Sequence, residues 1–359
     1  MRYVPTNCLR DGMILAKNIY DKDQNLMLSQ GQVIRESYID KIHRLGYSGV
    51  YVSDSLSDDI VIESIISDEL KISAVGAVKD VFITTGVNDR QINELVMENT
   101  KQVVYDLVDE LINNRNLMVN MVDLKVFDNY TFYHSVNVSV LSIIVGISMG
   151  YPRSALYKLG LGALLHDIGK IFIDKAILDK EGPLTEDEFA EIKKHPSLGY
   201  EYLIKHYDIP ARSYLGALHH HERYDGSGYP YSLRGDNISE IGRIIAVADV
   251  YDALTSDRPY RKALLPSDAM EYIMGGSDTM FDPRFVQKFI RKVAAFPLGT
   301  IVRLSDGAKA IVTLNHEDCC TRPRLRLISD NPLDEEEIYI DLRDDYSAKN
   351  LTIVEIIKK

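Results

Sequence analysis

Cysteine is scarce in this sequence: its 359 residues include only Cys8, Cys319 and Cys320. An odd number of cysteines, two of them adjacent, does not make a disulfide framework, and the pattern is typical of a protein from a reducing cytoplasm. The sequence also has no Cys-x-x-Cys pair, which argues against a thiolate zinc site. Any metal in this protein is therefore expected to be bound by histidine and carboxylate side chains.

Runs of basic residues are also absent, and the formal net charge is −12. A general nucleic-acid binder needs clustered lysine and arginine to neutralise phosphates, so that class of function is disfavoured. A small anionic ligand remains compatible with the composition if metals or a few arginines supply local positive charge.

Long apolar segments are missing as well. The chain begins MRYVPTNCLRDGM, which lacks the apolar core of a signal peptide. The longest apolar run, 136–149, is interrupted by Asn137, Ser139, Ser142 and Gly146. It is too short and too polar to span a bilayer, so we expect a buried core helix there. The expected location is the cytoplasm, with no membrane contact.

Four segments follow from the periodicity of the chain. The pattern predicts a small β-rich module over 1–60 and a helical connector over 61–120. It predicts a helical domain over 121–296 and a second small β-rich module over 297–359. The strand-like runs are 13–16, 26–28, 50–52, 300–304, 310–312, 324–328 and 338–340, and a short helix is expected over 34–45. The fold class is therefore mainly α, with a helical bundle flanked by β-rich modules.

Histidine is concentrated in the helical part. Seven of the nine histidines lie between residues 134 and 221: His134, His166, His195, His206, His219, His220 and His221. With Asp167 and Asp249 they form a set of imidazoles and carboxylates that suits Fe, Mn, Zn, Co or Ni. Five or six such ligands exceed one tetrahedral site, whereas a carboxylate bridging two metals would use them all, as in many phosphoester hydrolases. His206 and His219 have no companion motif, and we expect them to be ordinary packed or surface residues.

Several sequence blocks resemble those of the HD-GYP family of metal-dependent phosphohydrolases. His166-Asp167-Ile168-Gly169-Lys170 looks like the HD motif. The stretch HHERYDGSGYP, residues 220–230, resembles the HHExxDGxGYP signature, and His195-Pro196 begins an HPxxG block. The stretches ADVYDALT at 248–255 and RPYR at 258–261 resemble the next block. The order and spacing of these blocks over about 120–295 are highly specific.

The resemblance implies an HD-type helical bundle and a ligand set. His134, His166 and Asp249 would bind one metal, His195, His220 and His221 a second, and Asp167 would bridge the two. Two divalent ions are expected, with Fe or Mn favoured and Zn, Ni or Co as alternatives. Some members bind a third metal through a Glu four residues before the first histidine. Tyr130 occupies that position here, so we expect two metals rather than three.

The resemblance also assigns substrate contacts. Lys170 would touch a phosphate oxygen or help to protonate the leaving group, with Asp167 beside it in the catalytic centre. Arg258 and Arg261 match ligand-contacting basic residues of the family, and arginine suits bidentate contacts to phosphate or guanine. The loop Gly228-Tyr229-Pro230 would either shape the wall of the site or dock a diguanylate-cyclase (GGDEF) domain. On the helix of Asp249, Asp252 is placed to support a metal ligand.

The expected activity is hydrolysis of cyclic di-GMP to linear pGpG or GMP by a metal-bridging hydroxide. Two alternatives remain open at the level of sequence: a non-catalytic module that binds cyclic di-GMP, and an HD phosphohydrolase that acts on another nucleotide. A homodimer is compatible with the sequence, which does not decide the oligomeric state.

Overall fold

The computed structural model divides into two compact units, which are described here one at a time. The first comprises Met1–Ser64, Met118–Tyr130 and Val293–Lys359, and the second Ile65–Leu117 and Thr131–Lys292. The structure describes every residue except 22–24, 46, 48, 87–89, 121–129, 181, 257–262, 330–336 and 358–359; of Arg90 and Tyr130 it describes only the helical backbone. The four-segment division remains a prediction, but the β-rich segments from both ends of the chain lie in one unit.

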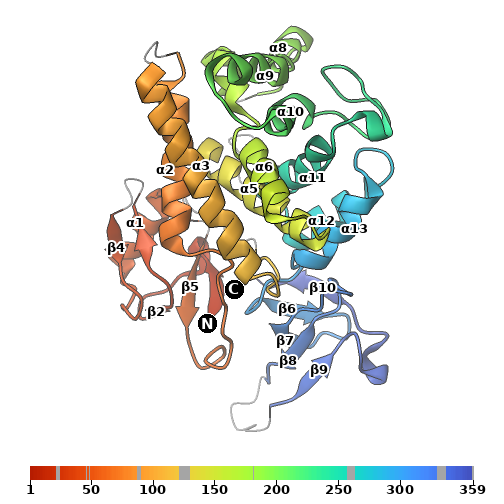
Figure 1. The fold of residues 1–359 in the computed structure, drawn as a ribbon. Helices are drawn as coiled ribbons and strands as arrows, with labels where there is room; N and C mark the ends of the chain where they lie inside the picture. The colour runs from red at the N-terminus through yellow and green to blue at the C-terminus, as the bar shows by residue number, and fades with distance from the viewer. Residues whose placement is uncertain are drawn as a thin grey trace. The chain divides into compact units, whose positions relative to one another are not determined.

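The first unit is built mainly from antiparallel strands (Figure 1). They are β1 (Arg2–Pro5), β2 (Ile14–Leu15), β3 (Ile19–Tyr20), β4 (Leu26–Leu28), β5 (Gly49–Ser53), β6 (Ile301–Leu304), β7 (Lys309–Leu314), β8 (Arg324–Leu327), β9 (Tyr339–Asp341) and β10 (Ile353–Ile356), with α1 (Glu36–Arg44) and the short helices η1 (Thr6–Cys8) and η4 (Tyr346–Ala348). The sheet orders are β1-β5-β2, β3-β4 and β10-β6-β7-β8-β9. The expectation of small β-rich modules at both ends is confirmed, while β1, β3 and β10 were not predicted.

Alternating burial explains how the C-terminal strands pack. In β6, Val302 and Leu304 are buried, whereas Ile301 and Arg303, which alternate with them, are partly exposed. Successive side chains of a strand point to opposite faces, so this pattern gives the sheet one apolar face. A further apolar cluster joins Tyr51 of β5 to Ile311 of β7. This cluster explains why segments from opposite ends of the chain share a unit.

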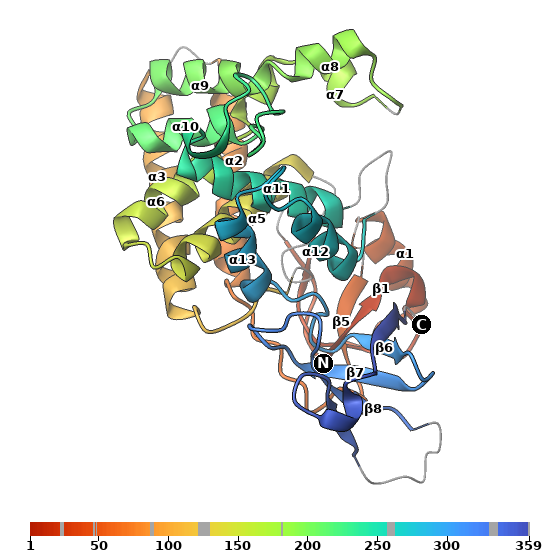
Figure 2. The same cartoon turned by 90° about the vertical axis from the view of Figure 1, so that its right-hand side faces the viewer.

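The second unit is helical (Figures 1 and 2). Its helices are α2 (Asp68–Thr84), α3 (Arg90–Asn113), α5 (Tyr130–Ser148), α6 (Arg153–Leu164), η2 (Ile168–Phe172), α7 (Lys175–Leu178), α8 (Glu186–Ile192), α9 (His195–His206), α10 (Ala211–His219), η3 (Gly235–Asn237), α11 (Glu240–Thr255), α12 (Pro266–Gly275) and α13 (Pro283–Lys292). The long helices α2 and α3 lie side by side, and α10 packs against α6, α9 and α11. The predicted mainly α fold class is confirmed.

Helix α5 lies in the core of this unit. Its segment Thr131–Ser148 is long and apolar enough to cross a membrane, yet 72% of it is buried inside the protein, as in the core helix of a globular domain. The polar residues that interrupt the run have local roles. Ser139 donates a hydrogen bond to the carbonyl of Gly160 at 2.9 Å, and Asn137 binds the carboxylate of Asp252. The expectation of a buried core helix is met.

Candidate metal centre

Seven side chains from five segments meet in the interior of the helical unit. His134 lies on α5, His166 and Asp167 follow α6, His195 begins α9, His220 and His221 follow α10, and Asp249 lies on α11. All but His221 are buried to 8% exposure or less. The structure thus brings together every residue that the sequence assigned to the metal shell. Arg258 and Arg261 lie outside the described residues, as does the side chain of Tyr130.

The carboxylate of Asp167 lies at the middle of this constellation, with its two oxygens facing different histidines. Oδ2 lies 3.3 Å from Nε2 of His166 and 3.7 Å from Nε2 of His134. Oδ1 lies 3.4 Å from Nε2 of His195 and 3.8 Å from Nε2 of His220. A carboxylate in this position can bridge two cations.

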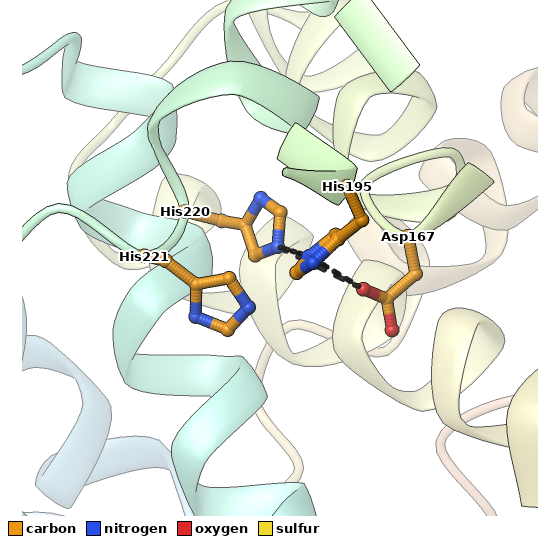
Figure 3. Close-up of side chains that lie close together, drawn as sticks. All are labelled: Asp167, His195, His220 and His221. Carbon is orange, nitrogen blue, oxygen red and sulfur yellow. Dashed lines mark hydrogen bonds and ion pairs between the residues drawn. The ribbon is translucent and has the colours of Figure 1, made fainter. Parts of the chain in front are cut away.

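Two groups of ligand atoms result. In each, the candidate atoms lie within 4.8 Å of one another: His134, His166 and Asp167 in one, and Asp167, His195, His220 and His221 in the other. Asp249 Oδ1 adds to the first at 3.1 Å from Nε2 of His134. We call the set His134, His166, Asp167 and Asp249 cluster A, and the set Asp167, His195, His220 and His221 cluster B. Figure 3 shows the side chains of cluster B converging.

Backbone carbonyls fix the tautomers of three of these histidines. Nδ1 of His166 lies 2.7 Å from the carbonyl of Ala163, and His195 and His220 contact the carbonyls of Ile192 and Ala217 at 2.7 and 2.8 Å. A carbonyl only accepts, so each Nδ1 must carry a proton, and in the neutral ring Nε2 then presents a lone pair.

The resulting lone pairs indicate a cation. Nε2 of His195 lies 3.2 Å from Nε2 of His220, and neither atom has a proton to donate to the other. Two nitrogens bound at about 2.1 Å to one metal stand at a comparable separation. The buried atoms His166 Nε2 and Asp167 Oδ1 have no hydrogen-bond partner among the described residues. Buried polar atoms without partners are costly, so the donor set fits divalent metal ions.

Burial and charge set the protonation of the shell. Burial lowers the pKa of His195 to about 4 and that of His221 to about 3, despite the carboxylates nearby. Both rings are therefore neutral at pH 7, which is the metal-binding form. Burial also acts to lower the pKa of His134, but hydrogen bonds to Asp249 and Asp252 outweigh it and raise the pKa to about 9. For Asp167, burial is outweighed by the charges of Lys170 and His166, which hold its pKa well below the usual value.

Lys170 lies beside the centre on η2. Its Nζ contacts Oδ2 of Asp167 at 2.5 Å, and its side chain is 30% exposed. The amine is thus placed between the buried carboxylate and solvent. Its predicted contact with a substrate phosphate remains a prediction.

Two glycines allow the Asp167 segment to approach the His195 segment. A Cβ at Gly169 would lie 1.9 Å from the carbonyl oxygen of His195 and 2.6 Å from the amide of Gly199. A Cβ at Gly199 would in turn lie 3.0 Å from the amide of Gly169. The two backbones cross in direct contact, and glycine is the residue that permits such an approach.

The loop after His221 forms a wall of the site. The ring of Tyr229 stacks on His221 with centroids 4.7 Å apart, and a Cβ at Gly228 would lie 2.3 Å from the amide of Arg223. Glu222 is 2% exposed and accepts hydrogen bonds from the backbone N–H groups of Tyr231 and Leu233 at 2.8 and 2.9 Å. These contacts fold the loop back onto the histidine pair, as the wall-shaping role requires. The docking role remains a prediction.

Replacing Glu222 with glutamine is expected to loosen this loop. The amide would turn an NH₂ group toward a backbone N–H, losing one hydrogen bond and leaving a buried donor unpaired, which costs about 1–3 kcal/mol. Faster hydrogen exchange at the amides of Tyr231 and Leu233, with a lower Tm, is the expected result. Glu201→Gln on the exposed face of α9 is the matched control. Unchanged exchange at both amides would contradict this role.

Of the seven histidines between residues 134 and 221, the two that lie outside the shell make other contacts. Nδ1 of His219 accepts a hydrogen bond from the backbone N–H of Ser239, just before α11. His206 is exposed and stacks on Tyr202, with ring centroids 4.5 Å apart. Asn137, by contrast, lies next to the shell, and the sequence analysis did not predict a role for it at the metal centre. The signal that could have indicated this role was its position three residues after His134, on the same helix face.

Residues 110–285 match the family model of the HD domain. The matched segment, which makes up just under half of the chain, is similar to HD domains. Its blocks at His166-Asp167 and Gly228-Tyr229-Pro230 identify the HD-GYP type.

Three of the similar proteins, each named as a cyclic dinucleotide phosphodiesterase, illustrate the similarity. "Cyclic di-GMP phosphodiesterase PA4108" of Pseudomonas aeruginosa is 38% identical over 226 residues, covering 62% of this chain and 54% of its own. "Cyclic di-GMP phosphodiesterase response regulator RpfG" of Xanthomonas campestris is 43% identical over 152 residues, covering 41% and 39%. "3'3'-cGAMP-specific phosphodiesterase 3" of Vibrio cholerae is 36% identical over 154 residues, covering 43% and 33%. The chain thus spans about half the length of the first relative and less of the other two.

Proposed function

We propose that this protein is a metal-dependent phosphodiesterase that hydrolyses cyclic di-GMP to linear pGpG or GMP. The observation that supports this best is the position of Asp167, whose two carboxylate oxygens face two separate groups of buried imidazoles. Binuclear centres with a shared carboxylate are typical of phosphoester hydrolysis. The relatives named as cyclic di-GMP phosphodiesterases support the choice of substrate.

Divalent metals in clusters A and B would supply a nucleophilic water ionised near neutral pH and charge to stabilise the phosphoryl oxygens. We infer iron or manganese, because imidazole mixed with carboxylate suits both. Within this chain, Asp167 and Asp249 provide the anionic ligands, and the histidines with fixed tautomers hold the geometry. The side chain of Lys170 is 30% exposed at the edge of the site, and its Nζ is placed to meet a phosphate oxygen or to donate a proton to the leaving 3′ oxygen.

Removal of the metals is expected to abolish hydrolysis and to lower the Tm. Cations bound by the folded state alone stabilise it, by about 2.7 kcal/mol at 100 times their Kd. The measurement is cyclic di-GMP turnover before and after chelation, with the metal content determined in each sample. Turnover is expected to return when Mn²⁺ or Fe²⁺ is added back without oxygen. Hydrolysis by protein verified to be free of metal would contradict the proposal.

A nucleotide panel tests the substrate. Because other relatives are named as specific for 3'3'-cGAMP, the panel should contain cyclic di-GMP, 3'3'-cGAMP and a mononucleotide. The proposal expects the highest kcat/KM for cyclic di-GMP. A higher kcat/KM for 3'3'-cGAMP would identify that compound as the substrate. Binding of cyclic di-GMP without formation of product would indicate a non-catalytic module.

A further inference from the structure

His134 of cluster A differs from three other histidines of the centre in the group that supports its ring. His166, His195 and His220 each donate Nδ1–H to a neutral backbone carbonyl. His134 instead has its Nδ1 2.7 Å from Oδ2 of Asp252, a carboxylate that is fully buried. An anionic acceptor makes an imidazole a stronger metal ligand than a neutral carbonyl does and also fixes its ring more firmly.

Asp252 is held at both oxygens. Its Oδ1 accepts a hydrogen bond from Nδ2 of Asn137 at 2.9 Å, while Oδ2 faces His134. His134 and Asn137 lie three residues apart on α5, and Asp249 and Asp252 lie three apart on α11, so each pair shares one helix face. The imidazole of His134 is consequently enclosed between two carboxylates, with Asp249 Oδ1 3.1 Å from Nε2 and Asp252 behind Nδ1.

Asn137 has little other reason to be buried. Its side chain is 3% exposed, and its Oδ1 has no hydrogen-bond partner among the described residues. A buried amide with one unsatisfied end weakens the fold, since desolvation of that group is not repaid. Among the described residues, its hydrogen bond to Asp252 is the side-chain contact that accounts for an asparagine at this position.

Charge divides unequally between the clusters as a result. Cluster A contains the carboxylate of Asp249 and shares that of Asp167 with cluster B. The carboxylate of Asp252 lies on the other side of the His134 ring. Cluster B, within the described residues, has three imidazoles and only the shared carboxylate of Asp167. Oxygen-rich, anionic surroundings favour hard cations, whereas imidazole-rich surroundings favour borderline ones.

The geometry points to two unequal metal positions, in which the Asp252–Asn137 pair is a positioning device that strengthens metal binding at cluster A and leaves cluster B unaffected. This inference rests on the proposed metal-dependent function. It adds Asn137 as a positioning residue that touches neither metal nor substrate, and it predicts that the two ions are bound with different affinities and leave the protein in sequence.

The test is an anaerobic titration of metal-free protein with Mn²⁺. Calorimetry and electron paramagnetic resonance monitor the binding of each ion. The wild-type protein is expected to bind two ions per chain in two resolvable steps. Asp252→Asn should weaken one step about 10–100-fold and leave the other unchanged, the range typical of residues that support a metal ligand. Asn137→Ala should weaken the same step by a smaller factor, and Asn137→Ser, which retains a donor, should recover part of it.

Ser142→Ala is the matched control. Ser142 is also a fully buried polar residue of α5, but it lies more than one helical turn beyond Asn137 and has no part in the clusters. It should leave both steps unchanged. Circular dichroism and Tm establish that each variant is folded, and Asn137→Ala decides the question if Asp252→Asn does not fold.

Equal weakening of both steps, or no change in either, would overturn the inference. Failure of the proposed function gives a different result: two ions bound by the wild-type protein in two steps, with no hydrolysis of any nucleotide in the panel. A wild-type protein that binds no Mn²⁺ would overturn both.

Discussion

Replacement of Asp167 by alanine is expected to reduce hydrolysis of cyclic di-GMP by at least about 10³-fold, since both metal positions lose their shared ligand. The carboxylate is 1% exposed and faces His166 on one side and His195 on the other. Removing it leaves two groups of imidazoles with no anion between them. Metal content should fall together with activity, measured as ions per chain and as turnover in the same preparation.

The control for this variant is Asp208→Asn, which alters an exposed carboxylate of the same helical unit between α9 and α10. It should retain wild-type turnover and metal content. An Asp167→Ala protein that binds two metals and turns over normally would show that the carboxylate bridges nothing.

A Gly169→Ala substitution should destabilise the helical unit by about 3 kcal/mol or more, equivalent to a fall in Tm of roughly 6–12 °C. The added Cβ would lie 1.9 Å from the carbonyl oxygen of His195, which is backbone and cannot move aside as a side chain could. The segments that position Asp167 and His195 would be pushed apart, so metal affinity should fall together with stability. Thermal unfolding with and without metal measures both effects.

Gly76→Ala is the appropriate comparison because Gly76 lies inside α2 and a Cβ there would meet nothing within 4 Å. Alanine is the better helix former, so this variant should be slightly more stable than the wild-type protein, by about 0.5–1 kcal/mol. If Gly169→Ala were as stable as Gly76→Ala, the close crossing of the two backbones would not exist in solution.

Much of the fold was predictable because the periodicity of the chain changes where the fold changes. The alternating residues of β6 and the helical spacing in α3 each lead to the observed element. The shared unit of the two terminal modules could not be predicted in this way. It depends on contacts such as that between Tyr51 and Ile311. These two residues are too far apart in the sequence for a local pattern to predict that they meet.

The residues of the candidate centre could be predicted where they belong to a recognisable sequence motif. His134 and Asp249, which have ordinary surroundings in sequence, were assigned to a metal by resemblance, and the structure places His134 beside the carboxylates of both Asp167 and Asp249. Supporting residues were harder to find. Glu222 is part of the signature, but its role in holding the loop depends on backbone N–H groups nine and eleven residues away. Asn137 belongs to no quoted block.

The most direct test of the proposed metal-dependent hydrolysis of cyclic di-GMP, with Asp167 as the shared ligand, is product formation as a function of metal content. Metal-free protein should be loaded with zero, one and two equivalents of Mn²⁺ or Fe²⁺ without oxygen, and its products separated by chromatography. No product is expected without metal, and full formation of pGpG or GMP is expected only as the second ion binds. Protein containing two ions per chain that leaves cyclic di-GMP intact would contradict the proposed function.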